Sequence, residues 1–242
     1  MENCSCMKRS GFLMASASLA AFAPSRASAD VVPGGTHAVE RRADFDEASF
    51  SAAVGKAADV RQLWESVAFH PAILNNVKNA LNGLQFGFGY PAERIAMVFA
   101  GHGSSSALTY SDYVWRKYAI GRAFKLSDAN GSALASNVFL QPATAPDAAT
   151  DADDPLSQYQ DTSIVALQRR GVVFLTCHTA VEEQARTLVT GGFASAGTSA
   201  TDVAADILTH LIPGAIVVPA MVAAIAVLQA RYGYSYISIA FA

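Results

Sequence analysis

Three short and almost entirely apolar segments constrain the fold of this 242-residue chain more than any other feature. They cover residues 95–100, 172–176 and 215–218, and segments with helical character follow each of them. An apolar run of this length indicates a strand that is buried on both faces, which is typical of parallel sheets. Strands that alternate with helices build a sheet covered by its own crossover connections. The sequence therefore predicts an α/β fold with a mainly parallel sheet and helices on both faces.

The remaining elements are less uniform. An apolar helix face is predicted from Ile73, Leu74, Val77, Leu81 and Leu84. Residues 60–69 fit an edge strand or a turn of helix. Further helices are expected at residues 45–58, 106–120, 163–170, 179–189, 202–211 (with Thr201 or Asp202 as N-cap) and 219–231, and a last strand at 234–240. Residues 30–70 are interpreted as an N-terminal arm with the first elements, and residues 71–242 as the α/β domain.

Residues 128–160 differ in composition from the rest of that domain. Ala, Asp, Thr, Pro and Ser dominate, and four aspartates fall at positions 147, 151, 153 and 154. Such a composition is typical of a flexible insertion. The aspartates lack the glycine and the distal glutamate of an EF-hand loop, so a solvated acidic loop is expected rather than a cation site.

The first 29 residues have the three-part layout of an export signal. Lys8-Arg9 supplies positive charge, residues 11–23 are moderately apolar, and Ala27-Ser28-Ala29 is a small-residue cleavage site. The sequence predicts cleavage near Ala29 and a periplasmic protein. The Lys8-Arg9 pair resembles a twin-arginine signal, which would allow export with a bound cofactor, and the general secretory route stays open.

Composition excludes two classes of protein. The net charge is −3 and no basic cluster is present, so nucleic-acid binding is not expected. The longest apolar stretch, residues 211–230, is interrupted by Pro213, Gly214 and Pro219. It is interpreted as a buried strand followed by a buried helix rather than an integral membrane segment.

The carboxyl ends of parallel strands are the usual ligand sites of such sheets. His102 follows the first apolar run, Cys177 and His178 follow the second, and Pro219 follows the third. Gly101 and Gly103 flank His102, which indicates a close backbone approach to a ligand or a tight turn. We therefore take Cys177 and His102 as candidate catalytic residues, and candidate substrate-binding residues are Gly101, Gly103, His178 and Pro219.

Cys177 has two interpretations. Cys4 and Cys6 lie in the predicted leader, so the mature chain would hold one thiol without an internal disulfide partner. At the N-terminus of the helix predicted after it, a thiolate would be favoured, and His102 could act on it as a base or as a cation. Alternatively, Cys177 is a buried residue that packs like alanine or valine.

Other chemistries lack their sequence patterns. No dinucleotide fingerprint, Walker lysine or serine-hydrolase elbow occurs near these residues. Cys177, His102 and His178 are suitable ligand types for a soft metal, yet no local ligand spacing supports a metal site. Neither a metal nor a cofactor is expected.

Two segments resemble a known family. Residues 166–177 (Ala-Leu-Gln-Arg-Arg-Gly-Val-Val-Phe-Leu-Thr-Cys) and residues 216–230, followed by Tyr234-Ser235-Tyr236-Ile237, are similar to DsrE/DsrF-like proteins. The resemblance implies a flavodoxin-like fold, a homo-oligomer (often a trimer or hexamer) and, in some members, persulfide transfer on a cysteine. Cys177 matches the family's strand-end cysteine, and His102 matches its His-Gly position.

These observations lead to one main hypothesis and two alternatives. The main hypothesis is an exported persulfide carrier that holds sulfane sulfur on Cys177 and exchanges it with a donor or acceptor protein. One alternative is a non-catalytic α/β oligomer that binds a small ligand or a partner protein. The other is a periplasmic redox protein with a cofactor.

Overall fold

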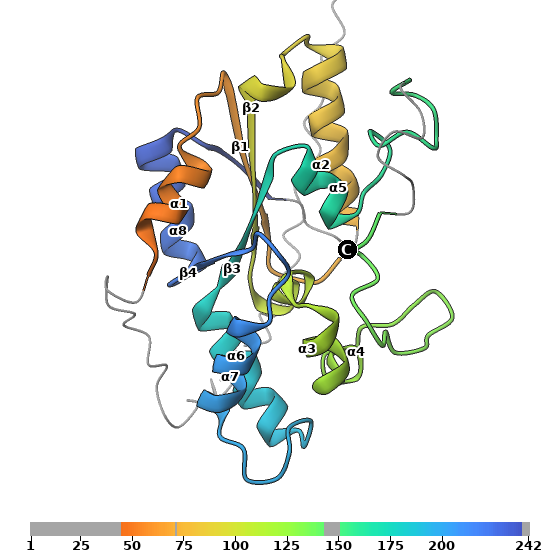
Figure 1. Ribbon diagram of the computed structural model, residues 1–242, viewed down its shortest axis with the longest axis vertical. Helices are drawn as coiled ribbons and strands as arrows, with labels where there is room; N and C mark the ends of the chain where they lie inside the picture. The colour runs from red at the N-terminus through yellow and green to blue at the C-terminus, as the bar shows by residue number, and fades with distance from the viewer. Residues whose placement is uncertain (1–44, 71, 143–150, 239–242) are drawn as a thin grey trace, which may run out of the picture. The chain divides into compact units, whose positions relative to one another are not determined.

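A five-stranded parallel sheet forms the centre of the computed structural model, which describes residues 45–70, 72–142 and 151–238 (Figure 1). The strand order is β4-β3-β2-β1-β5, and every neighbouring pair is parallel. The strands are β1 (Val60–Ser66), β2 (Ile95–Gly101), β3 (Val172–Cys177), β4 (Ile216–Val218) and β5 (Ser235–Ser238). The predicted α/β class with a parallel sheet is confirmed. The predicted leader lies outside the described residues.

Helices cover both faces of this sheet, as predicted. On one face lie α2 (Ala72–Asn82) and α5 (Ile164–Arg169), and on the other lie α1 (Glu47–Val54) and α8 (Met221–Tyr232) (Figure 1). The buried residues of α2 include Ile73, Leu74, Val77 and Leu81. The apolar helix face predicted from the sequence is therefore the face that packs into the core. The α2 helix continues into a π-helical turn, η2 (Gly83–Gly87), and a 3-10 turn, η3 (Ala92–Arg94), leads into β2.

A third group of helices packs below the carboxyl ends of the strands. It contains α3 (Asp112–Lys117), α4 (Ile120–Ala123), α6 (His178–Thr190) and α7 (Ala200–Thr209) (Figure 1). Trp115 and Tyr110 are fully buried in its core together with Val181 and Ile207. The apolar core at this end of the sheet is therefore separate from the two cores on the sheet faces.

Three sequence-based expectations are wrong in detail. The single helix expected at residues 106–120 is a 3-10 helix, η4 (Gly103–Thr109), followed by α3 and α4. Tyr110 and Ser111 are extended between η4 and α3, and Ala119 takes a left-handed conformation (φ 46°) between α3 and α4. Strand β1 is not an edge strand, since β5 pairs with its outer side. The N-cap of α7 is Ser199, whose hydroxyl and Asp202 form a reciprocal capping box.

The described parts of the 128–160 segment pack closely against the rest of the protein. Leu140 and Ser157 are buried, and Asn137 is 4% exposed. The Asn137 amide donates to the carbonyl oxygens of Leu108 and Tyr110 at 2.9 Å each. Residues 143–150 lie outside the described residues. The segment therefore contributes side chains to the core, although its composition indicated little core-forming content.

Asp206 of α7 connects the carboxyl-end helices through a network of three donors. The hydroxyl of Tyr118 donates to its carboxylate at 2.7 Å, Lys117 Nζ at 3.0 Å and the Tyr113 hydroxyl at 3.2 Å. Burial alone would raise the pKa of Asp206, but the hydrogen bonds from Tyr118 and Lys117 outweigh it and hold the pKa below its usual value.

This network predicts a dependence of stability on acid. A lowered pKa in the folded state adds stability above the usual pKa of about 4, and this contribution is lost as the pH falls through the folded-state pKa. We expect Asp206→Asn to lose about 1 kcal/mol at pH 7. In urea titrations the difference from wild type should shrink below about pH 4. An equal difference at pH 7 and pH 2.5 would contradict this account.

Candidate functional site

The carboxyl ends of β1, β2 and β3 bring three of the chemically relevant side chains to one edge. Glu65 of β1 pairs with Ala100 of β2, Gly101 of β2 pairs with Thr176 of β3, and Cys177 ends β3 opposite Val218. Side chains alternate between the two faces along each strand. Ala100, Leu175 and Cys177 belong to the core on the face of the sheet that α1 and α8 cover. The candidate site therefore lies on that face, at the carboxyl ends of the strands.

Cys177 receives two backbone hydrogen bonds from the first turns of two different helices. It is the last residue of β3 and the N-cap of α6. Its Sγ accepts from the amide of Ala180 in α6 at 3.5 Å and from the amide of Met221 in α8 at 3.3 Å. Free first-turn amides and the helix dipole favour a negative charge on the atom they face. The sulfur is therefore faced by two helix starts, and the residue is only 5% exposed.

Pro219 positions these two helix starts relative to each other. Its carbonyl oxygen accepts from the Thr179 amide at 3.3 Å and from the Thr179 hydroxyl at 3.0 Å. Thr179 lies in the first turn of α6, and Pro219 lies just before α8. Pro219 therefore holds the starts of α6 and α8 in the positions from which both helices donate to the Cys177 sulfur.

His102 lies beside a buried carboxylate. Its Nε2 is 2.8 Å from Oε1 of Glu65, and the two side chains are 19% and 14% exposed. The Tyr236 hydroxyl of β5 donates to the other Glu65 oxygen, and this hydrogen bond raises the pKa of Tyr236. When Glu65 is ionised its oxygens only accept, so Nε2 of His102 is then the donor and Nδ1 of a neutral imidazole holds the lone pair.

His102 and Cys177 occupy neighbouring register positions. Gly101 of β2 pairs with Thr176 of β3. The backbone of His102 is still extended (φ −143°, ψ −177°), so His102 and Cys177 occupy the next pair of positions along the two strands. Both then project to the same face. Within the part of the chain that the structure describes, the two side chains make no direct hydrogen bond, so a small molecule would have to connect them.

A hydrogen-bond chain links three residues in the neighbourhood of Cys177. The Tyr110 hydroxyl donates to Gln184 Oε1 at 2.7 Å, and the Gln184 amide donates to the Gly103 carbonyl. Burial raises the pKa of Tyr110, and the charge of nearby Cys177 raises it further, so Tyr110 stays a neutral phenol. The chain connects the turn after β2 to α6.

The two glycines beside His102 are explained by packing. A Cβ on Gly103 would lie 2.7 Å from the Val67 carbonyl oxygen, and its φ of +54° is strained for other residues. A Cβ on Gly101 would lie 2.7 Å from the Phe99 ring. Both glycines therefore let the turn after β2 approach its neighbours closely, and neither requires a ligand for its explanation.

His178 directly follows Cys177 in the chain. It is the first residue of α6, and its Nδ1 lies 3.9 Å from Oε1 of Glu182, one turn further along the helix. This geometry is an ion pair only when the imidazole is protonated. Among the described residues, no group of three or more His, Cys, Asp or Glu side chains is arranged to hold a metal ion.

Sequence reasoning missed Glu65 and Tyr236, the two partners of His102. Glu65 belongs to a segment that fitted either a strand or a helix, so its face could not be assigned. A carboxylate in a seven-residue strand is the signal that could have found it, because a charge near a strand's carboxyl end is costly without a partner.

Comparisons with protein-family models, with curated proteins and with solved structures found no match for this chain. The resemblance to DsrE/DsrF-like proteins therefore stays a prediction. In the part of the chain that the structure describes, no helix has the length and apolar character needed to cross a membrane.

Proposed function

We propose that this protein accepts sulfane sulfur on Cys177 and holds it as a persulfide. The observation that carries the proposal is the pair of amides, from Ala180 and Met221, that face the Cys177 sulfur. Two helix starts directed at one sulfur atom favour the nucleophilic thiolate and then the anionic persulfide. The predicted export signal would place this carrier in the periplasm, and the family resemblance implies exchange of sulfur with a donor or acceptor protein.

The transfer step needs no external oxidant or reductant. The Cys177 thiolate attacks the outer sulfur of a small persulfide or polysulfide. A new S–S bond forms to Cys177, the S–S bond of the donor breaks, and the donor leaves as a thiolate with that electron pair. The thiol proton passes through a bridging water molecule to Nδ1 of His102, and the carboxylate of Glu65 stabilises the imidazolium through Nε2.

A groove between α1 and α8 lies next to the strand residue that neighbours Cys177. Its volume is about 190 Å³, and Val218, Pro219 and Ala220 form the side nearest the start of α8. Cys177 is not among its lining residues, and Val218 is the strand neighbour of Cys177.

The experiment that tests the proposal is intact-mass analysis after polysulfide treatment. Purified protein should gain one or more sulfur masses, and a thiol reductant should remove them. Peptide mapping should place the adduct on Cys177. Protein that gains no mass, or that gains it on another residue, would contradict the proposal.

A second candidate function is that of a non-catalytic α/β oligomer, and two observations favour it. The Cys177 side chain is nearly buried, as a packing residue would be. Helix α8 also exposes an apolar face to solvent, made of Val222, Ala223, Ala226, Val227 and Ala230. Such a face is typical of a surface that contacts another protein. In this case binding and oligomeric state would be unchanged in a variant without the thiol.

A further inference from the structure

We propose that the amino-terminal end of the sheet carries a second site, which binds a small oxyanion of the phosphate or sulfate type on Arg170. This site does not depend on the proposed chemistry of Cys177, because it lies at the other end of β3. Arg170 is the C-cap of α5 and comes just before that strand.

The first observation is an unpartnered guanidinium. Nη1 and Nη2 of Arg170 are both enclosed, and neither has a hydrogen-bond partner. Burial lowers the pKa of Arg170 to about 10, while the adjacent Tyr159 favours the charged form. Tyr159 lies under the guanidinium, 5.2 Å from ring centre to Cζ, which offsets only part of the cost of burying a cation. Two donors of the guanidinium fork thus lack an acceptor, and an anion reaches them when the side chain turns toward the adjacent cavity.

The second observation is a nearby cation that makes the local charge more positive. Lys78 of α2 is 8% exposed, and its Nζ donates to Gln160 Oε1 at 3.0 Å. Burial lowers the pKa of Lys78, and the positive charge of Arg170 lowers it further. Neither residue forms an ion pair with a carboxylate of the described residues. An anion is the group that would neutralise this pair.

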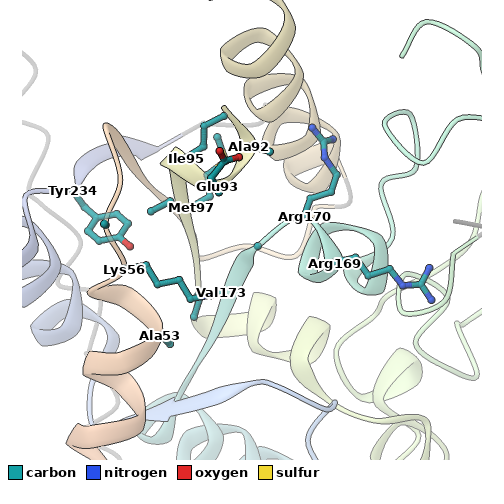
Figure 2. Close-up of a pocket in the computed structure, with 13 residues that line it drawn as sticks. Ala53, Lys56, Ala92, Glu93, Ile95, Met97, Arg169, Arg170, Val173 and Tyr234 are labelled. Atoms are coloured by element: carbon teal, nitrogen blue, oxygen red, sulfur yellow. The ribbon is translucent and has the colours of Figure 1, made fainter. Parts of the chain in front are cut away.

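The third observation is a pocket beside these groups. A cavity of about 190 Å³ is lined by Arg169, Arg170, Gln85 and Tyr159, with Leu81 and Ile95 as apolar walls. Gln85 belongs to the π-helical turn after α2, and π-helical turns often occur at functional sites. Figure 2 shows the Arg170 side chain extending toward α2, whereas Arg169 extends away from the strands.

The chemistry of these groups selects the ligand class. A guanidinium presents two parallel N–H donors that match two oxygens of a tetrahedral oxyanion, and such bonds are among the strongest polar contacts. The Gln85 amide and the Tyr159 hydroxyl are additional groups that can bind the same anion or a substituent on it. A cation ligand is disfavoured, because the described lining contains no carboxylate.

Thermal unfolding with added anions tests this site. Sodium phosphate or sodium sulfate, compared with sodium chloride at equal ionic strength, should raise the Tm of the wild-type protein in a saturable way. Arg170→Gln should abolish the rise, and Arg170→Lys, which keeps the charge but loses the fork, should weaken binding at least tenfold. Arg116→Gln is the matched control, since Arg116 is an exposed arginine of α3 outside the pocket, and it should respond as wild type does.

A second measurement keeps the test decisive if a variant folds poorly. Isothermal titration of wild-type protein with phosphate should show one saturable site, and Arg170→Gln without anion should be no less stable than wild type, because it removes an uncompensated buried charge. The proposal is overturned if wild type shows no saturable response, or if Arg170→Gln and Arg116→Gln respond alike. A negative result for anion binding would not change the expected result of the mass-spectrometric test of Cys177. The two proposals can therefore be rejected independently.

Discussion

Replacing Cys177 by serine is expected to abolish sulfur loading completely while leaving the protein folded. Serine is a good helix N-cap, and its hydroxyl can accept the hydrogen bonds that Ala180 and Met221 now give to the sulfur. It cannot form an S–S bond. After polysulfide treatment the intact mass of the variant should be unchanged, whereas the wild-type protein gains sulfur.

Two further variants separate chemistry from packing. Cys177→Ala should lose the adduct as well, and its stability should change by about 1 kcal/mol or somewhat more, because two amides lose their acceptor. His102→Gln should slow loading without preventing it, since the imidazole assists the thiol and does not carry the sulfur. An adduct that persists on Cys177→Ser would show that another group reacts and would remove the basis of the proposed function.

Replacing Trp115 by alanine is expected to give the largest loss of stability, about 3–5 kcal/mol. Trp115 is fully buried at the centre of the carboxyl-end core, and its ring lies edge-on to Phe69 with centroids 6.2 Å apart. Its Nε1 donates to the Ala107 carbonyl at 3.0 Å. The variant loses this hydrogen bond and leaves a cavity among helices that already form a separate core. Urea denaturation followed by circular dichroism measures the change.

Trp115→Phe is the control for this variant. It keeps most of the ring volume and loses the Nε1 hydrogen bond, so a smaller loss of about 1–2 kcal/mol is expected. Hydrogen exchange should show the destabilisation of Trp115→Ala mainly in α3, α6 and α7, since the cores on the two sheet faces are separate. A loss of less than about 1 kcal/mol in Trp115→Ala would contradict the interpretation of Trp115 as the centre of that core.

The parts of the fold that were predictable are those whose burial is visible in local sequence. Strands β2 and β3 are buried along most of their length, and the edge strand β4 is partly buried, so each is an apolar run in the sequence. Strand β1 was ambiguous because Arg61, Gln62 and Glu65 interrupt its pattern. The break at Ala119 was not predictable, since a left-handed alanine leaves no signal in composition or periodicity.

The candidate site could be predicted only in part, for a similar reason. Cys177 and His102 follow apolar strands, so the rule that ligands bind at strand ends selects them without any contact information. Their partners come from other places in the chain. Tyr236 reaches Glu65 only because β5 lies next to β1, and Met221 reaches Cys177 only through the turn before α8. Contacts of this kind depend on strand order, which the sequence pattern did not specify.

The position of β5 also determines when the sheet can be completed. The Ser235 hydroxyl donates to the Arg61 carbonyl, and these residues are 174 positions apart. Until β5 emerges from the ribosome, one edge of β1 exposes unpaired amides and carbonyls, which are a template for pairing with other chains. A nascent chain interrupted before Ser235 would carry that open edge and would be prone to aggregate. The last described strand therefore couples protection of this edge of β1 to synthesis of residues 235–238.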